Sequence, residues 1–242
     1  MVVVGSARID ERGNANWGKA GDQTSREVAT EPYYKHRLGW YLLRPKEAAV
    51  ARKIGLAMVE ACLNNNIGYD QSERYGVINC LKKYGRIAKI NEPTEADCSS
   101  LVRACCIQAG IQVGDFNTSS EVAVLERTGA FQKAVVVAND IRLCAGDVLV
   151  TRTKGHTVIV TEGYPREDEK PTAKPTAKPT AKPTTKPSVK PKPNKAGRKS
   201  LEDVAREVIA GKWGNNPERK DKLIKAGYAP AEVQAVVNKL LK

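Results

Sequence analysis

The sequence has little of what several functional classes require. Its 242 residues include two histidines, and its six cysteines show no Cys-x-x-Cys spacing. We therefore expect no metal site and no cofactor, and reduced thiols are the default state of these cysteines. No stretch approaches the roughly 20 apolar residues that cross a bilayer. Charges follow the first three valines, so we expect neither membrane insertion nor a Sec signal peptide.

The net charge of +13 is concentrated in one segment. Residues 170–199 hold ten basic side chains and no acidic one, whereas residues 1–169 hold 22 basic and 21 acidic side chains and residues 200–242 hold eight and six. The remainder of the chain is nearly neutral, so no nucleic-acid partner is expected. The alternative is a DNA-binding protein. It would require that residues 170–199 bind DNA and that this affinity fall steeply as the salt concentration rises.

Residues 170–190 place a lysine followed by a proline at every fourth position. Such a segment cannot form a core and favours an extended, polyproline-like spacer of about 3.1 Å per residue. We therefore expect three parts: a domain at residues 1–165, a Lys/Pro/Thr-rich linker at residues 166–199 and a small module at residues 200–242.

The first part is predicted to be an α+β domain. Apolar spacing predicts helices over residues 45–62, 71–83 and 97–110, and strand-like runs follow at residues 133–138, 147–151 and 156–162. Helices followed by strands suit an antiparallel sheet with helices packed on it. Residues 200–242 contain helix-start signals at Ser200, Pro217 and Pro230, which predict a three-helix module.

The strongest chemical signal is the segment DCSSLVRACC, which places Cys98 at the start of an amphipathic helix. The helix amino terminus favours a thiolate, so we expect a lowered pKa for Cys98. His156 follows 58 residues later, at the start of the run HTVIV. A Cys on a helix followed by a His on a strand is typical of papain-like cysteine hydrolases, in which the imidazole takes the thiol proton. The other five cysteines are expected to be packing residues.

The motifs DCSSLV, AGDVLV and GHTVIV together resemble the NlpC-type peptidoglycan peptidases and the related CHAP amidases. The opening SARIDERGNANWGKAGDQTSREV and the segment GWYLLRPKEA resemble the catalytic modules of phage endolysins, so the resemblance covers most of residues 1–164. It implies a papain-like fold with Cys98 as nucleophile and His156 as general base. Asp97 and Ser99 would then bind the peptide stem of the substrate.

The sequence departs from this family at Ser100, where glycine is usual, and it offers no strand after the histidine strand for a third polar residue. Asp22 is the first candidate for that residue, because a carboxylate fixes the imidazole tautomer and stabilises its charged form. Gln23 suits an oxyanion hole instead. His36 and Glu162 are further candidates, and the alternative that AGDQT is only a polar loop stays open.

The run EVIAGKWGNNPERKDKLIKAGYAPAEVQAVVNKLL resembles the Cpl-seven type of wall-binding repeat. The resemblance implies peptidoglycan as the partner, with Trp213, Tyr228 and Arg219 as contact residues, because aromatic faces can lie on sugars and a guanidinium can hold a carboxylate. The alternative places Trp213 and Tyr228 in the core of the module and Arg219 on a helix surface.

Taken together, the resemblances imply a monomeric endolysin that waits in the host bacterial cytoplasm and acts on the wall after release. We expect an amide bond of the stem peptide to be cleaved through a thioester at Cys98. The first expectation is the bond between D-glutamate and the diamino acid. An N-acetylmuramoyl-L-alanine amidase and a wall-binding protein without catalysis are the alternatives.

Overall fold

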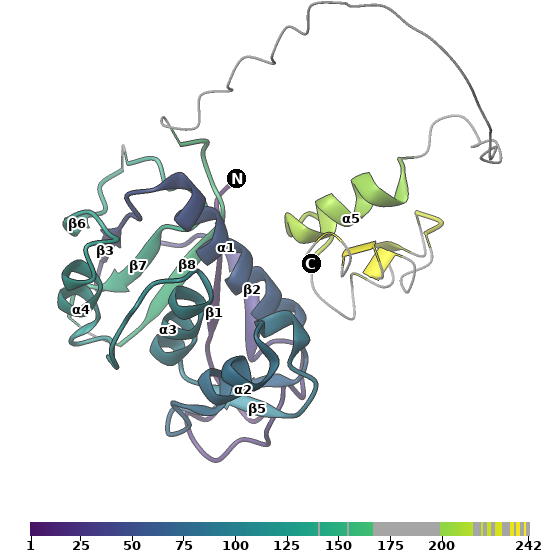
Figure 1. Ribbon diagram of the computed structural model, residues 1–242, viewed down its shortest axis with the longest axis horizontal. Helices are drawn as coiled ribbons and strands as arrows, with labels where there is room; N and C mark the ends of the chain where they lie inside the picture. Colours follow the sequence, from purple (N-terminus) through teal and green to yellow (C-terminus); the bar gives the residue numbers. More distant parts are fainter. Residues whose placement is uncertain are drawn as a thin grey trace, which may run out of the picture.

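The computed structural model describes residues 1–139, 141–153, 155–166 and 199–214 (Figure 1). It also describes residues 219, 222, 223, 226–228, 233, 234, 236, 237 and 240. The predicted linker, apart from its end residues Arg166 and Lys199, lies outside the described residues. No described helix combines the length and the hydrophobicity that a bilayer crossing requires.

A six-strand antiparallel sheet forms the centre of the first domain, with strands in the order β2-β1-β8-β7-β3-β6. The strands are β1 (Val3–Ala7), β2 (Val28–Pro32), β3 (Trp40–Leu43), β6 (Val135–Val136), β7 (Val148–Thr151) and β8 (Thr157–Glu162). The α+β prediction is therefore confirmed, and β6, β7 and β8 lie within the predicted runs. The expectation that helices precede the strands was wrong, because β1, β2 and β3 come first and β1 pairs with β8.

Helices pack on one face of this sheet (Figure 1). They are α1 (Ala48–Leu63), α3 (Cys98–Gln108) and α4 (Glu121–Arg127), whereas α2 (Gly76–Tyr84) packs on α3 and on the 3-10 turn at Ile87–Lys89. Helices α1, α2 and α3 match the predicted helices, although α2 begins five residues late, and α4 was not predicted. A short parallel pair, β4 (Ile67–Tyr69) and β5 (Thr94–Ala96), precedes α2 and α3 and directs the chain into the α3 amino terminus.

The two faces of the sheet bury different sets of side chains. Val148, Val150 and Ile159 face the helices and join the larger core cluster. Leu149 and Val158 face the other way and pack with Trp40 in a smaller cluster. Because side chains alternate along a strand, His156 and Thr157, which flank the start of β8, project toward opposite faces.

Two glycines allow α1 to approach the sheet closely. Gly146, in the turn before β7, has φ +87°, and a Cβ atom there would lie 2.1 Å from the carbonyl oxygen of Ala51 in α1. A Cβ on Gly5 of β1 would lie 2.7 Å from Cγ of Met58. Asp147, which follows Gly146, is fully buried and accepts hydrogen bonds from Arg44 Nε and Nη2 at 2.9 and 2.7 Å. The AGDV motif therefore fixes the start of β7.

The carboxy-terminal module begins with α5 (Leu201–Ile209), which Ser200 caps by accepting the Asp203 N–H at 3.1 Å. The buried side chains of its described part gather in one cluster: Val204, Ala205, Val208, Leu223, Val233 and Val237. The first predicted helix is thus confirmed. The bounds of the second and third lie outside the described residues, although several residues between 219 and 240 are helical.

We predict that Gly146→Ala lowers the free energy of unfolding far more than Gly129→Ala. Gly129 also has a positive φ of +72°, but a Cβ atom there meets nothing within 4 Å, so its substitution carries only the conformational cost of about 1 kcal/mol. Gly146→Ala adds overlap with the α1 backbone and should cost roughly 3–5 kcal/mol. Urea unfolding followed by circular dichroism measures both. Equal losses would show that the α1 contact at Gly146 is not tight.

Candidate active site

Cys98 is the first residue of α3, and the surrounding DCSS motif organises this helix end. Asp97 is the N-cap, and its carboxylate accepts the Ser100 N–H. The Ser100 hydroxyl accepts the Asp97 N–H at 3.0 Å, which completes a capping box. Ser99 donates its hydroxyl to Asp97 at 3.0 Å. Ser100 therefore has a structural role at this end of the helix.

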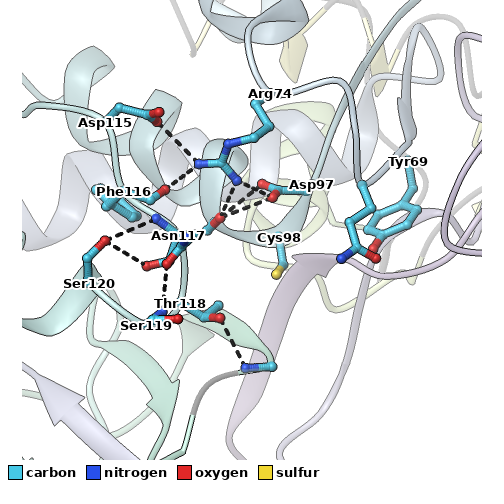
Figure 2. A pocket seen from close by; sticks show the side chains of 13 residues that line it. Tyr69, Arg74, Asp97, Cys98, Asp115, Phe116, Asn117, Thr118, Ser119 and Ser120 are labelled. Carbon is cyan, nitrogen blue, oxygen red and sulfur yellow. Dashed lines mark hydrogen bonds and ion pairs between the residues drawn. The ribbon is translucent and has the colours of Figure 1, made fainter.

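Arg74 holds the Asp97 carboxylate from the loop before α2 (Figure 2). Its Nη1 forms an ion pair with Asp97 and donates to Ser99 Oγ at 3.1 Å. Its Nη2 reaches Asp115 at 3.2 Å and also donates to the Phe116 carbonyl. Asp97 and Ser99, predicted to bind substrate, are therefore engaged with each other and with Arg74, which the sequence patterns did not single out.

The Cys98 sulfur lies where two central strands separate. β1 pairs with β8 as far as Gly5 and Ile159, whereas β1 continues alongside β2 to Ala7. The Thr157 N–H, which lies beyond the end of the β1–β8 pairing, donates to the Cys98 thiol. The Cys98 sulfur thus accepts a hydrogen bond from the backbone of the residue that follows His156.

A cavity of about 680 Å³ opens onto this sulfur. Tyr69 lies on one side of it (Figure 2), and Gln71 and Gly155, the residue before His156, also line it. The opposite side is formed by Arg74 and residues 115–120. The cavity is mostly polar in its lining side chains, which suits a hydrophilic, extended substrate.

The His156 ring lies on the other face of the sheet, beside aromatic side chains. Its backbone is fixed to Thr151, whose N–H donates to the His156 carbonyl at 3.0 Å. The Trp40 ring lies 6.4 Å from the His156 ring and 5.2 Å from that of His36, measured between centroids. Among the described residues, no hydrogen bond joins the His156 ring to Cys98 or to Asp22.

Burial keeps both groups of the predicted pair neutral at neutral pH. It raises the pKa of the Cys98 thiol to about 12, and the charges of the Asp97 and Glu121 carboxylates raise it further. Hydrogen bonds from the N–H groups of Thr157 and Ser99 lower this pKa, but by less. The expected lowering of this pKa by the helix terminus was therefore wrong, because desolvation outweighs it. Burial also lowers the pKa of His156 to about 4, and the charges of His36 and Arg8 act in the same direction.

Glu121 is a second residue that the sequence patterns missed. It opens α4, is fully buried, and accepts the Thr157 hydroxyl at 2.7 Å through Oε1. Its Oε2 is buried without a hydrogen-bond partner, and burial raises the pKa of the carboxyl to about 8. Thr157 therefore contacts both residues: its hydroxyl donates to Glu121, and its N–H donates to Cys98.

Asp22 is engaged within its own loop. Its carboxylate accepts backbone N–H groups from Thr24 at 3.0 Å, Arg26 at 3.2 Å and Val28 at 3.4 Å. The prediction that Asp22 orients His156 is not supported by this geometry, because these turn contacts occupy both of its oxygens. The alternative of a polar loop describes Asp22 better.

The remaining third-residue candidates separate clearly. The Gln23 amide donates to the carbonyls of Ala20 and Gly21 at 3.0 and 2.9 Å, so it also supports its own loop. Glu162 ends β8, six residues after His156 and roughly 20 Å along the strand. His36 alone among the four candidates shares the ring cluster with His156 in the described part of the chain.

The candidate wall-binding residues of the second module are largely engaged in packing. The Trp213 and Tyr228 rings meet edge to face at 6.1 Å, and Trp213 Nε1 donates to Glu207 at 3.1 Å. Arg219 is 4% exposed and donates to Gln234 at 3.4 Å. The alternative of a surface charge at Arg219 was therefore wrong, because the guanidinium is buried.

No group of three or more His, Cys, Asp or Glu side chains in the described residues is placed to hold a metal ion. Comparison with known proteins gives a family for each module. Residues 4–165 match the model of the endolysin-like domain, and residues 202–241 match that of the CW_7 repeat. No solved structure matches the chain.

A curated relative is the lysozyme of Streptococcus phage Cp-7, which is 57% identical over 42 residues. The match covers 17% of this chain and 12% of the relative, so the chain spans about an eighth of that protein's length. The domain match, in contrast, covers most of the chain, including Cys98, His156 and all of the sheet except Val3. The chain therefore belongs to the endolysin-like domain family, and it carries a CW_7 repeat in its carboxy-terminal module.

Proposed function

We propose that the chain is a bacteriolytic cell-wall hydrolase that cleaves an amide bond of peptidoglycan with Cys98 as nucleophile. One observation carries this proposal: the Cys98 sulfur, at the start of a buried helix, accepts the N–H next to His156 and faces a large polar cavity. The match to the endolysin-like domain family supports the same reaction class. A papain-like mechanism is the simplest chemistry for this pair of residues.

In the proposed mechanism, the His156 ring turns from the Trp40 cluster toward the sulfur, and the Cys98 thiol then gives its proton to the neutral imidazole as the sulfur attacks the amide carbonyl. The C–N bond then breaks, the imidazolium returns the proton to the leaving amine, and a thioester remains on Cys98. Water then gives a proton to His156 and attacks the thioester, the C–S bond breaks, the acyl product leaves as a carboxylic acid, and the imidazolium returns its proton to the sulfur. The raised thiol pKa and lowered imidazole pKa support a proton transfer that occurs with attack rather than a preformed ion pair.

Two roles move to residues other than those expected from the sequence. Gln71 lines the cavity beside Cys98, so we assign to its amide the oxyanion-stabilising role first considered for Gln23. His36, whose charge acts on His156 and whose ring packs on the same Trp40, takes the place of Asp22 as the neighbour of the base. Both assignments rest on proximity within the folded domain.

The carboxy-terminal module would dock the hydrolase on its substrate. The CW_7 repeat supports peptidoglycan as the partner of residues 202–241. A tether between two wall-directed modules raises the local substrate concentration for the hydrolase. The bond between D-glutamate and the diamino acid is the first choice for cleavage, and the bond between muramic acid and L-alanine is the second.

We predict that Cys98→Ala abolishes the clearing of a suspension of purified walls, with a loss of at least about 10³-fold in rate. Cys80→Ser is the matched control, because Cys80 is also buried but does not line the cavity, and it should retain activity. Unchanged lysis by Cys98→Ala would refute the assignment of the nucleophile. Absence of lysis by the unaltered chain would instead favour a wall-binding protein without catalysis.

Mass spectrometry of the released fragments identifies the bond. A new free amino group on the diamino acid indicates the endopeptidase, and one on L-alanine indicates the amidase.

We predict that kcat/KM on a soluble stem peptide falls on the acid side with a midpoint near pH 4 rather than near 6.5. The base must be neutral to accept the thiol proton, and the buried imidazole becomes protonated only below its lowered pKa of about 4. Activity should drop about tenfold per pH unit below that point. The protein must stay folded over the range, which circular dichroism checks. A midpoint near 6.5 in folded protein would contradict the buried, neutral state of His156.

We predict that Glu121→Gln speeds the alkylation of Cys98 by iodoacetamide at pH 9 and leaves it unchanged at pH 6. Above its pKa of about 8, the Glu121 carboxylate is charged and disfavours the nearby thiolate, whereas below that pH it is protonated and uncharged. Glutamine keeps the shape and an oxygen that accepts the Thr157 hydroxyl. Peptide mapping by mass spectrometry follows Cys98 separately from the other cysteines. Equal rates for both proteins at pH 9 would show that Glu121 does not act on the thiol.

A further inference from the structure

Trp17, in the long loop between β1 and β2, combines two unusual properties. Its side chain is 81% exposed, and its backbone has a φ of +69°. A bulky residue in the left-handed region costs about 1–3 kcal/mol, and an indole in water gains nothing from burial. Neither property stabilises the fold.

The strained conformation is imposed by specific hydrogen bonds. The Trp17 N–H donates to Asp70 Oδ2 at 2.8 Å, and Arg12 donates to the Trp17 carbonyl. Arg12 is held in turn by Asp10, which is 3% exposed and accepts from Arg12 Nη2 and Nε at 2.9 and 3.3 Å. Both backbone groups of Trp17 are thus fixed, so the point at which its exposed side chain leaves the loop is fixed.

This loop adjoins the wall of the cavity. Asp70, which fixes Trp17, lies between Tyr69 and Gln71, and both of these line the cavity with Cys98. The Gln71 N–H donates to the Ala15 carbonyl at 2.8 Å, which joins the loop to that wall a second time. Trp17 therefore stands beside the rim of the cavity that contains the nucleophile.

We propose that Trp17 is a substrate-binding residue whose indole stacks on a sugar ring of the glycan strand while the attached peptide enters the cavity over Cys98. The proposal rests on the proposed function. An exposed indole on a fixed backbone is well suited to an apolar ring face. Exposed polar neighbours, Asn14 and Lys19, suit the hydroxyl groups around such a face. The nearby Glu11, Asp10 and Asp70 disfavour an anionic membrane as the alternative ligand.

Binding can be tested without turnover. The protein is the full chain with Cys98→Ala, and the probe is a soluble tetrasaccharide of alternating N-acetylglucosamine and N-acetylmuramic acid. We expect it to change the tryptophan fluorescence of this protein, and we expect most of that change to disappear when Trp17→Phe is added. Trp40 and Trp213 are present in both proteins, so the difference reports Trp17. An identical change in both proteins, or none in either, overturns the proposal.

Turnover gives a second, independent readout. Trp17→Gly should lower kcat/KM about tenfold on a glycan-bearing fragment and leave it unchanged on a sugar-free stem peptide. Tyr164→Ala, at an exposed aromatic that does not line the cavity, should change neither. Glycine relieves the positive φ, so the Tm of Trp17→Gly should not fall, which excludes unfolding as the cause. Equal losses of kcat/KM on both substrates overturn the proposal. If the unaltered chain cleaves neither substrate, the proposed function is refuted, and the fluorescence test decides whether Trp17 binds the glycan.

Discussion

The site depends on one buried carboxylate, that of Asp97. A charge taken out of water must be satisfied, and Asp97 is satisfied by the first turn of α3, by Ser99 and by Arg74. These contacts fix the amino terminus of α3 relative to the loops on both sides, because Arg74 also holds Asp115 and the Phe116 carbonyl. Cys98 is the next residue after Asp97. The contacts that satisfy the Asp97 carboxylate therefore also set the position of the Cys98 sulfur.

The other half of the site comes from the separation of β1 and β8. These strands lie more than 150 residues apart in sequence, and they pair only as far as Gly5 and Ile159. Where they part, the Thr157 N–H is available to the sulfur and the Thr157 hydroxyl to Glu121. Close packing of α1 at Gly146 holds β7, and through it β8, against the helix layer. The cavity therefore exists only when both ends of the domain have joined one sheet.

Electrostatics at the site follow from burial more than from the helix dipole. The dipole and the N–H groups at the start of α3 favour a thiolate, but desolvation and two carboxylates oppose it more strongly. Burial likewise keeps the His156 imidazole neutral. Under the proposed function, two neutral groups would transfer the proton only at the moment of attack. The raised pKa also protects the thiol from oxidation, since the thiolate is the reactive form.

The sequence by itself determined the features that depend on near neighbours. Cys98 starts a helix because Asp97 and Ser100 cap it, β7 and β8 follow from their valine-rich runs, and the glycine in AGDV serves the turn before β7. Strands β1, β2 and β3 were missed because each has only four or five residues and their burial depends on partners elsewhere. Only the tertiary structure decided that Asp22 caps its own loop, that Arg74 and Glu121 lie near Cys98, and that the thiol pKa rises. Those outcomes depend on desolvation and on contacts between distant segments, and neither is encoded in local spacing.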